Sequence, residues 1–174
     1  MNQPLKNLEN PWLTNFNLET KNKMRLFSFS YSGAGAGVYL QWAKLFQEYE
    51  IDLIAIQLPG REQRIREKKI TSLPELIQHL LVAIYPLTDT PFAFFGHSLG
   101  GLVAFELSRK LAEEKNVTPQ HLFISGFRSP DMPNPNQELH QLADNSLLEK
   151  IAEYGGTPDI ISVSYTHLRA HETP

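Results

Sequence analysis

The sequence predicts one α/β domain built on a mostly parallel sheet with flanking helices, and three observations point to that class. Short apolar runs rich in β-branched and aromatic residues alternate with amphipathic stretches of helical length. The 174 residues include 41% hydrophobic and 20% charged residues, which is ordinary for a globular domain with a substantial core. A Gly-x-Ser-x-Gly segment also stands between an apolar run and a long helical pattern. Strands that alternate with helices form βαβ units with right-handed crossovers.

The N-terminal part of the chain is expected to contain two strands joined by one helix. The first strand is predicted at 24–31 and the second, rich in β-branched residues, at 51–58. Between them, 38–49 is predicted to be helical, with four apolar residues available for a buried face: Leu40, Ala43, Leu45 and Phe46. Before the first strand, residues 1–23 are rich in Asn, Lys and Glu and contain a short Pro11-Trp12-Leu13 anchor.

The middle of the chain continues the alternation. Ser72 and Glu75 form a capping box, with a proline in the first turn, that opens a helix. The buried face of this helix is expected to carry five apolar residues: Leu76, Ile77, Leu80, Leu81 and Ile84. A strand at 92–95, a helix at 99–115 and a strand at 121–125 follow. After a proline-rich break at 130–135, two short helices are predicted: 139–142 and 147–154.

Composition excludes several classes of function. A net charge of −3 argues against a dedicated nucleic-acid binder. No stretch approaches membrane-spanning length, and the polar N-terminus lacks the apolar core of a signal peptide, so a cytoplasmic protein is expected. Without cysteine there is no disulfide, thiolate nucleophile or cysteine-based metal site. The sequence offers no metal site and no cofactor-binding fingerprint, and a monomer is expected.

The segment Gly96-His97-Ser98-Leu99-Gly100 is the most informative in the chain. Between a strand and a helix, Gly-x-Ser-x-Gly forms the nucleophile elbow of an α/β-hydrolase. Such a turn forces Ser98 into a strained backbone conformation, and the two glycines leave room for strand and helix to pass closely. The alternative is a Gly/Ser turn that only starts a helix.

Five motifs in order extend the resemblance beyond the elbow. They are FSFSYSGAGAG (27–37), IQLPGRE (56–62), GHSLGG (96–101), FISGFRSP (123–130) and YGGTP (154–158). From about Met24 to Ile161 the chain resembles the type II thioesterases, stand-alone editing enzymes of nonribosomal peptide and polyketide synthesis. The resemblance implies hydrolysis of acyl or aminoacyl thioesters on the phosphopantetheine arm of acyl or peptidyl carrier proteins, with no cofactor of the enzyme's own.

By this resemblance Ser98 is the catalytic nucleophile. A serine hydroxyl needs a histidine base that is oriented by a carboxylate, and the oxyanion needs two backbone N–H donors. The expected donors are Leu99, which follows the nucleophile, and Ser32, in the loop after the first predicted strand. That loop reads Phe-Pro-Tyr-Ala-Gly-Gly in the family, so Ser30 and Ser32 depart from it, and the missing proline leaves the loop less rigid. The alternative is a flexible turn without a donor role.

No histidine before Ile161 matches the family's base. His97 is adjacent to the nucleophile in a tight turn, so its ring is expected to pack structurally. The other three histidines before that point are expected to be surface or core residues: His79, His121 and His140. In the family, the catalytic aspartate and a Gly-Gly-His base lie downstream of the GGTP motif.

The catalytic aspartate is also unmatched before Ile161. Thioesterase domains built into synthetases carry an aspartate where Gly126 stands here, which favours the stand-alone type. Asp131 is a poor substitute and is expected to be a turn residue.

A charged segment lies between the second strand and the capping box. Residues 61–69 carry a local charge of +3 from Arg61, Arg64, Arg66, Lys68, Lys69, Glu62 and Glu67. The segment is expected to be a solvated connection, and the alternative is a patch that attracts an acidic carrier protein or the pantetheine phosphate. Arg61 and Glu62 are alternatively expected to brace the edge of the sheet.

The C-terminal part is predicted to contain a lid and a tail that is not native. Residues 131–161 match the family's lid insertion in position, and lids commonly gate such sites. Residues 162–174 resemble the translation of a transposon-type sequencing adapter, so the thioesterase domain is expected at 1–161 and incomplete at its C-terminus. The 174-residue chain is therefore expected to be nearly inactive. Two alternatives stay open, a general carboxylesterase or lipase and a non-catalytic carrier-binding fragment.

Overall fold

The computed structural model describes residues 10–16, 23–129, 132 and 146. The chain divides into two compact units, residues 1–128 and 129–174, and the first contains all the strands and helices given below. The predicted lid at 131–161, apart from Met132 and Ser146, and the predicted tail at 162–174 lie outside the described residues, as do Asp131 and His140.

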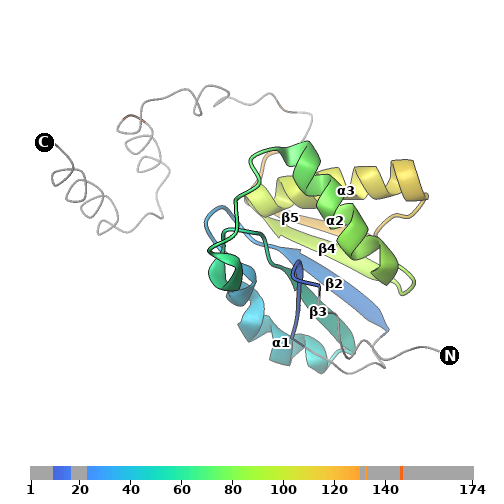
Figure 1. Ribbon diagram of the computed structural model, residues 1–174. Helices are drawn as coiled ribbons and strands as arrows, with labels where there is room; N and C mark the ends of the chain where they lie inside the picture. Colours follow the sequence, from blue (N-terminus) through green and yellow to red (C-terminus); the bar gives the residue numbers. More distant parts are fainter. Residues whose placement is uncertain (1–9, 17–22, 130–131, 133–145, 147–174) are drawn as a thin grey trace, which may run out of the picture. The chain divides into compact units, whose positions relative to one another are not determined.

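A five-stranded, mostly parallel sheet forms the centre of the first unit (Figure 1). Its strands are β1 (Leu13–Asn15), β2 (Met24–Phe29), β3 (Ile51–Ile56), β4 (Phe92–His97) and β5 (His121–Ser125). The strand order is β1-β3-β2-β4-β5, and every pair is parallel except β1 with β3. The strands β3 and β1 therefore lie on one side of β2, and β4 and β5 lie on the other. In such sheets ligands bind at the carboxyl ends of the strands where the order reverses, which here is between β2 and β4.

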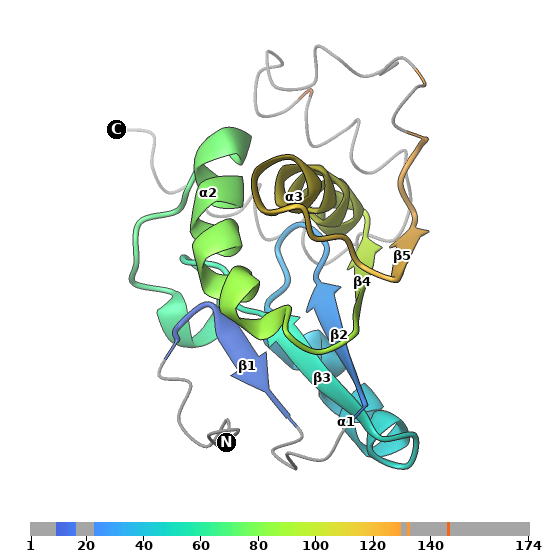
Figure 2. The same cartoon turned by 90° about the vertical axis from the view of Figure 1, so that its right-hand side faces the viewer.

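Helices cover both faces of this sheet. The short 3-10 turn η1 (Ala36–Tyr39) leads into α1 (Leu40–Gln47) on one face, and α2 (Leu73–Ile84) and α3 (Leu99–Lys115) lie together on the other (Figure 2). Two more 3-10 turns, η2 (Glu62–Arg64) and η3 (Tyr85–Leu87), lie in the connections. The Ser72 hydroxyl accepts the Glu75 N–H at 3.5 Å, which confirms the predicted N-cap of α2.

Alternating side chains of the strands form two cores. Phe27, Phe29 and Ile54 pack under α2 and α3, and Leu26 and Leu53 pack under α1. The larger core contains the predicted buried face of α2 together with three aliphatic residues of α3, and all eight are buried: Leu76, Ile77, Leu80, Leu81, Ile84, Val103, Leu107 and Leu111. Both faces of β2, β3 and β4 are covered, which is why these strands are almost continuously apolar.

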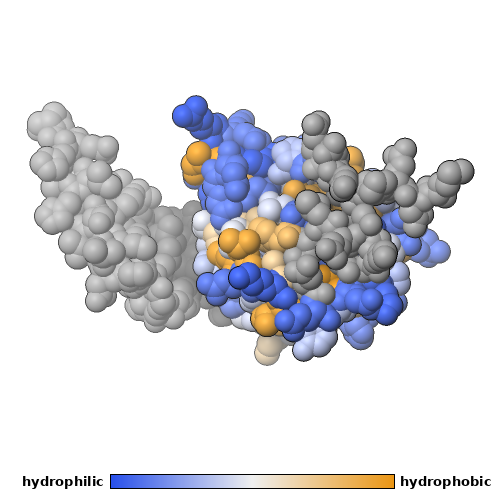
Figure 3. Space-filling model, turned by 90° about the horizontal axis from the view of Figure 1, so that it is seen from below, coloured by the Kyte–Doolittle hydropathy of each residue, from blue (hydrophilic) through white to orange (hydrophobic). Residues whose placement is uncertain are grey.

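The structure corrects the predicted face of the first helix. Leu40 and Leu45 were expected inside, but they are 59% and 60% exposed, whereas Tyr39 and Ala43 are buried. Tyr39, Ala43 and Phe46 follow the i, i+4, i+7 spacing of one helical face, and Leu40 and Leu45 flank that face on either side. The predictions for Ala43 and Phe46 are therefore confirmed. From below, apolar residues gather in the middle of the surface and hydrophilic residues border them (Figure 3).

Four strands differ from the predictions. The Pro11-Trp12-Leu13 anchor leads into β1, an antiparallel edge strand that was not predicted. The strands β2 and β3 each end two residues earlier than expected, and β4 continues to His97. Within the described residues, no helix combines the length and the apolar character needed to cross a membrane.

Candidate active site

Ser98 stands at a sharp turn between β4 and α3. Its backbone dihedrals are φ 53° and ψ −120°, a strained conformation for a residue with a side chain. The turn is fixed on both sides, because the Ser98 N–H donates to Ser125 O at 2.8 Å and the Gly101 N–H donates to Ser98 O at 2.8 Å. The strand, the strained serine and the helix confirm the predicted strand–turn–helix geometry of an elbow at Ser98.

The two glycines of the motif are required by close backbone contacts. A Cβ on Gly96 would lie 2.2 Å from Gly100 O, and a Cβ on Gly100 would lie 2.1 Å from Phe29 O. The opposing atoms are backbone and cannot move aside as a side chain end could. The start of α3 therefore packs directly on the end of β2, which brings the loop after β2 beside the elbow.

That loop contains the predicted oxyanion donor Ser32. The Ala34 N–H donates to Tyr31 O at 3.1 Å, and Gly33 has φ 87°, so Ser32 occupies the first central position of a tight turn. Ser30, which replaces the family's proline, is buried, and its hydroxyl donates to Ala34 O at 3.2 Å. This hydrogen bond restrains the turn where the proline ring is missing.

Leu99, the second predicted donor, is the first residue of α3. The first N–H groups of a helix have no intrahelical acceptor, so its N–H is available to an oxyanion. The structure thus brings the turn of Ser32 and the start of α3 to the same edge of the sheet. The roles of Ser98, Leu99 and Ser32 in catalysis stay predictions.

His97 has the packing role that was expected. Its Nδ1 lies 3.0 Å from the Ser125 hydroxyl, and the Tyr31 ring meets its ring edge to face. A Cβ on Gly126, which has φ 62°, would lie 2.7 Å from His97 Cε1. The ring is therefore enclosed by neighbours, and no hydrogen bond joins it to the Ser98 hydroxyl in the part of the chain that the structure describes.

The other described histidines lie elsewhere. His79 on α2 stacks on Trp12 at 5.3 Å between ring centroids, and His121 lies exposed at the start of β5. Neither contacts Ser98 through any hydrogen bond of the described residues. No group of three potential metal ligands occurs within this described part either. Among the described residues, no histidine is hydrogen-bonded to the Ser98 side chain, so the base and its carboxylate partner are not identified in this part of the chain.

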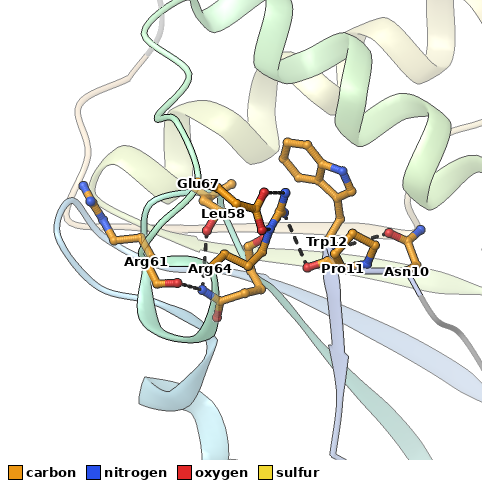
Figure 4. A network of polar contacts seen from close by, with 8 residues as sticks. Asn10, Pro11, Trp12, Leu58, Arg61, Arg64 and Glu67 are labelled. Carbon is orange, nitrogen blue, oxygen red and sulfur yellow. Dashed lines mark hydrogen bonds and ion pairs between the residues drawn. The ribbon is translucent and has the colours of Figure 1, made fainter.

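Arg64 is the centre of a polar network that the sequence analysis did not foresee (Figure 4). Its guanidinium forms two hydrogen bonds with the Glu67 carboxylate, at 2.8 and 2.6 Å, and donates to Gln57 O at 2.9 Å. It also lies over the Trp12 ring, 4.6 Å from the centroid. The hydrogen bond from Arg64 lowers the pKa of the Glu67 carboxyl.

This network bears on the basic segment at 61–69. The Arg64 side chain is only 10% exposed and joins the loop to the segment before β1, so it is not part of a free basic patch. Arg61 donates to Gly60 O at 2.9 Å. Arg66, Lys68 and Lys69 are exposed, as expected for a solvated connection.

Comparisons with known proteins agree with this geometry. The family model described as "Thioesterase domain" matches residues 24–171. The chain is 40% identical over 152 residues to the gramicidin S biosynthesis protein GrsT of Aneurinibacillus migulanus, covering 87% of this chain and 59% of that protein. It is also 40% identical over 147 residues to a protein named linear gramicidin dehydrogenase LgrE of Brevibacillus parabrevis, covering 84% of this chain and 56% of that protein.

Among solved structures, the type II thioesterase BorB from the borrelidin biosynthetic cluster is similar with a TM-score of 0.73 and 27% identity. The match covers 86% of this chain and 60% of BorB. The chain thus spans less than two thirds of the length of these relatives. The fold matches that of the type II thioesterases, as the sequence predicted.

Proposed function

This chain belongs to the thioesterase domain family, and on that premise we propose that Ser98 is the nucleophile in thioester hydrolysis. The proposed substrates are acyl or aminoacyl groups on the phosphopantetheine arm of the carrier proteins of a nonribosomal peptide or polyketide synthetase. The observation that carries the proposal is the strained elbow, with Ser98 at φ 53° between β4 and α3. The names of GrsT, a gramicidin S biosynthesis protein, and of BorB, a type II thioesterase from the borrelidin biosynthetic cluster, support this substrate class.

The proposed reaction has two steps. A histidine base removes the Ser98 proton as the oxygen attacks the thioester carbonyl. The oxyanion then accepts hydrogen bonds from the backbone N–H groups of Leu99 and Ser32. The tetrahedral intermediate expels the pantetheine thiolate, which takes up the proton from the histidine. Water then attacks the acyl-serine through the same base and releases the acid and Ser98. The base and its carboxylate partner are expected downstream of the GGTP motif.

A general carboxylesterase or lipase of the same fold is the nearest alternative, because an elbow attacks oxygen esters as well as thioesters. Rates on an acyl-pantetheine carrier protein and on a matched aryl ester distinguish the two. A clear preference in kcat/KM for the carrier-bound thioester supports the proposal, and a preference for the aryl ester contradicts it.

The name of LgrE raises a second possibility, a dinucleotide-dependent enzyme. Such enzymes seat a pyrophosphate at the N-terminus of the helix that follows a glycine-rich turn. Here the Glu62 carboxylate occupies that position and accepts the Gly37 N–H at 3.1 and 3.2 Å. Because a carboxylate would repel a pyrophosphate, this loop favours the hydrolase, with no cofactor of its own.

The decisive variant is Ser98→Ala in the full-length gene product. Loss of thioester hydrolysis by a factor of about 10³ or more is expected, because triad members act as a unit. Retained hydrolysis would falsify the assignment of the nucleophile. The variant with Ser32→Ala is the control, since a backbone donor survives a change of side chain and the rate should be nearly unchanged.

The non-catalytic alternative is tested with the 174-residue chain itself. If this chain holds a carrier protein without hydrolysing its thioester, titration of the carrier gives saturable binding in the absence of turnover. We propose further that the protein is cytoplasmic and monomeric, and light scattering of the full-length protein checks the monomer.

A further inference from the structure

The loop after β3 lies against the loop after β2 at the carboxyl ends of two adjacent parallel strands. Gln57, which follows β3, is buried, and its Oε1 accepts the Ala36 N–H at 2.9 Å. The other end of the same amide donates to Arg61 O at 2.9 Å. The buried Gln57 side chain therefore joins the two loops, and its hydrogen bond to Arg61 O fixes the conformation of the loop after β3.

Glu62 makes the second connection between these loops. Its carboxylate oxygens lie 3.1 and 3.2 Å from the Gly37 N–H, which they accept. Gly37 lies in the first turn of η1, where N–H groups lack helical acceptors and attract negative charge. Glu62 thus caps a helical segment that is 25 residues away in the sequence.

The neighbouring glycines make room for this carboxylate. A Cβ on Gly35 would lie 2.4 Å from the Glu62 carboxyl carbon, and a Cβ on Gly37 would lie 2.8 Å from its Oε1. Neither glycine has a positive φ, so alanine could adopt both backbone conformations. Glu62 itself has φ 42°, an uncommon conformation that persists only where surrounding contacts enforce it.

The loop held in this way is the one that carries the Ser32 N–H. At its start, the backbone of Phe29 and Ser30 rests on Gly100 of α3. At its end, Ala36 and Gly37 are held by Gln57 and Glu62. The turn between these anchors is restrained internally by the Ser30 hydroxyl, which donates to Ala34 O, and the anchors at its two ends set its place relative to the elbow.

We propose that Glu62 is a positioning residue that, through the Gly37 N–H, sets the place of the oxyanion loop relative to Ser98. The inference rests on the proposed function, because it assigns Ser32 as an oxyanion donor. An oxyanion donor acts in the transition state, so a displaced loop lowers kcat more than it raises KM. Glu62 lies at the surface, so its loss leaves both cores intact.

The test compares Glu62→Ala with Glu62→Gln and with Glu67→Ala in the full-length protein. Glu67 is the matched control, because it is on the same loop and in an ion pair but does not contact residues 30–37. Glu62→Ala should lower kcat about 10- to 100-fold with KM within about twofold, in the range of a misplaced catalytic group. Glu62→Gln should recover most of this loss, since its amide oxygen still accepts an N–H. Glu67→Ala should keep the kcat of the wild type.

Gly37→Ala provides an independent route to the same displacement. The new methyl group would lie 2.8 Å from Glu62 Oε1, so the carboxylate must shift away from the Gly37 N–H. The kcat should therefore fall in the same direction as in Glu62→Ala, and the double variant should be no worse than Glu62→Ala alone. Additive losses overturn the proposal. The affinity of an acyl trifluoromethyl ketone, which forms a tetrahedral adduct with the serine, should fall by the same factor as kcat in each variant.

Hydrogen exchange gives a readout that does not depend on turnover. The Gly37 amide should exchange faster in Glu62→Ala than in the wild type, and its rate in Glu67→Ala should equal that of the wild type. Equal exchange rates in Glu62→Ala and the wild type overturn the proposal. Ser98→Ala separates the two hypotheses. If it remains active, the proposed function fails. If it is inactive while Glu62→Ala keeps the kcat of the wild type, only the positioning role fails.

Discussion

Replacement of Gly100 by alanine tests the close packing of α3 on β2. Alanine is the better helix former by about 1 kcal/mol, so helix propensity alone predicts that Gly100→Ala stabilises the protein. The new Cβ, however, would lie 2.1 Å from Phe29 O and 2.7 Å from Ser30 O. The first distance is about 1.3 Å shorter than an ordinary 3.4 Å contact. Both opposing oxygens belong to the backbone, so they cannot rotate away from the new Cβ.

The magnitude follows from these opposing effects. Relief of the contact requires α3 to move away from β2, and overpacking of this kind costs typically about 1–3 kcal/mol and occasionally more. The clash involves two carbonyl oxygens, so we expect a net loss of about 2–4 kcal/mol in the free energy of unfolding. For a chain of this size, Tm should fall by roughly 5–15 °C. Hydrolysis should fall with it, because the elbow and the oxyanion loop separate.

Urea and thermal unfolding followed by circular dichroism measure the effect, with Gly101→Ala as the matched control. The adjacent Cβ would lie 2.9 Å from a methyl carbon of Ile124 and 3.4 Å from Gly96 O. Because this contact is 0.8 Å longer than the one at Gly100 and requires a shift of only about 0.5 Å of one methyl group, this variant should lose less stability, about 1 kcal/mol. Equal stability of Gly100→Ala and the wild type would refute the reasoning, as would equal damage from both alanines.

Three further predictions concern single side chains. Burial, and then the nearby Tyr31, raises the pKa of Tyr39 from 10.0 to about 12. The neutral Tyr39 therefore contributes about 2–3 kcal/mol to the free energy of unfolding below pH 10, and this contribution is lost as the pH rises toward 12. Unfolding of Tyr39→Phe, measured over this pH range, should lack that loss. Arg64→Lys should lower stability by about 1–2 kcal/mol in urea unfolding, because lysine cannot pair with both Glu67 oxygens and stack on Trp12, and unchanged stability would contradict this. Leu107→Ala should cost about 2–5 kcal/mol, since the side chain is completely buried, and a smaller loss would mean that the core collapses around the gap.

The nucleophile elbow could be predicted from the sequence because its constraints are local. Glycines two residues before and two after Ser98 are needed where strand and helix cross, and the apolar run and the helical pattern stand directly beside them. The capping box at Ser72 was predictable for the same reason, since its hydrogen bond spans three residues. The parallel sheet followed from the alternation of strands and helices.

Features that depend on distant partners were missed or misplaced. The strand β1 has three residues, too few for a period-two pattern, and its backbone becomes a strand only because β3 offers a free edge. The face of α1 was wrong at Leu40 and Leu45 because the sheet buries the face of Tyr39, Ala43 and Phe46, and the two leucines flank it. Arg64 belongs to a charged segment, yet Glu67 and Trp12 together make it a nearly buried anchor.

The sequence by itself predicted the class of the fold and the candidate nucleophile, because the alternation of strands with helices and the Gly-x-Ser-x-Gly turn are local patterns. The family followed from the resemblance of five motifs to the type II thioesterases. Only the tertiary structure decided which groups hold the oxyanion loop. Gly37 and Glu62 lie on separate crossovers, and their contact exists because β2 and β3 are parallel neighbours whose carboxyl ends share one edge of the sheet. Spacing along the chain carries no record of such a contact, since it arises when strands pair.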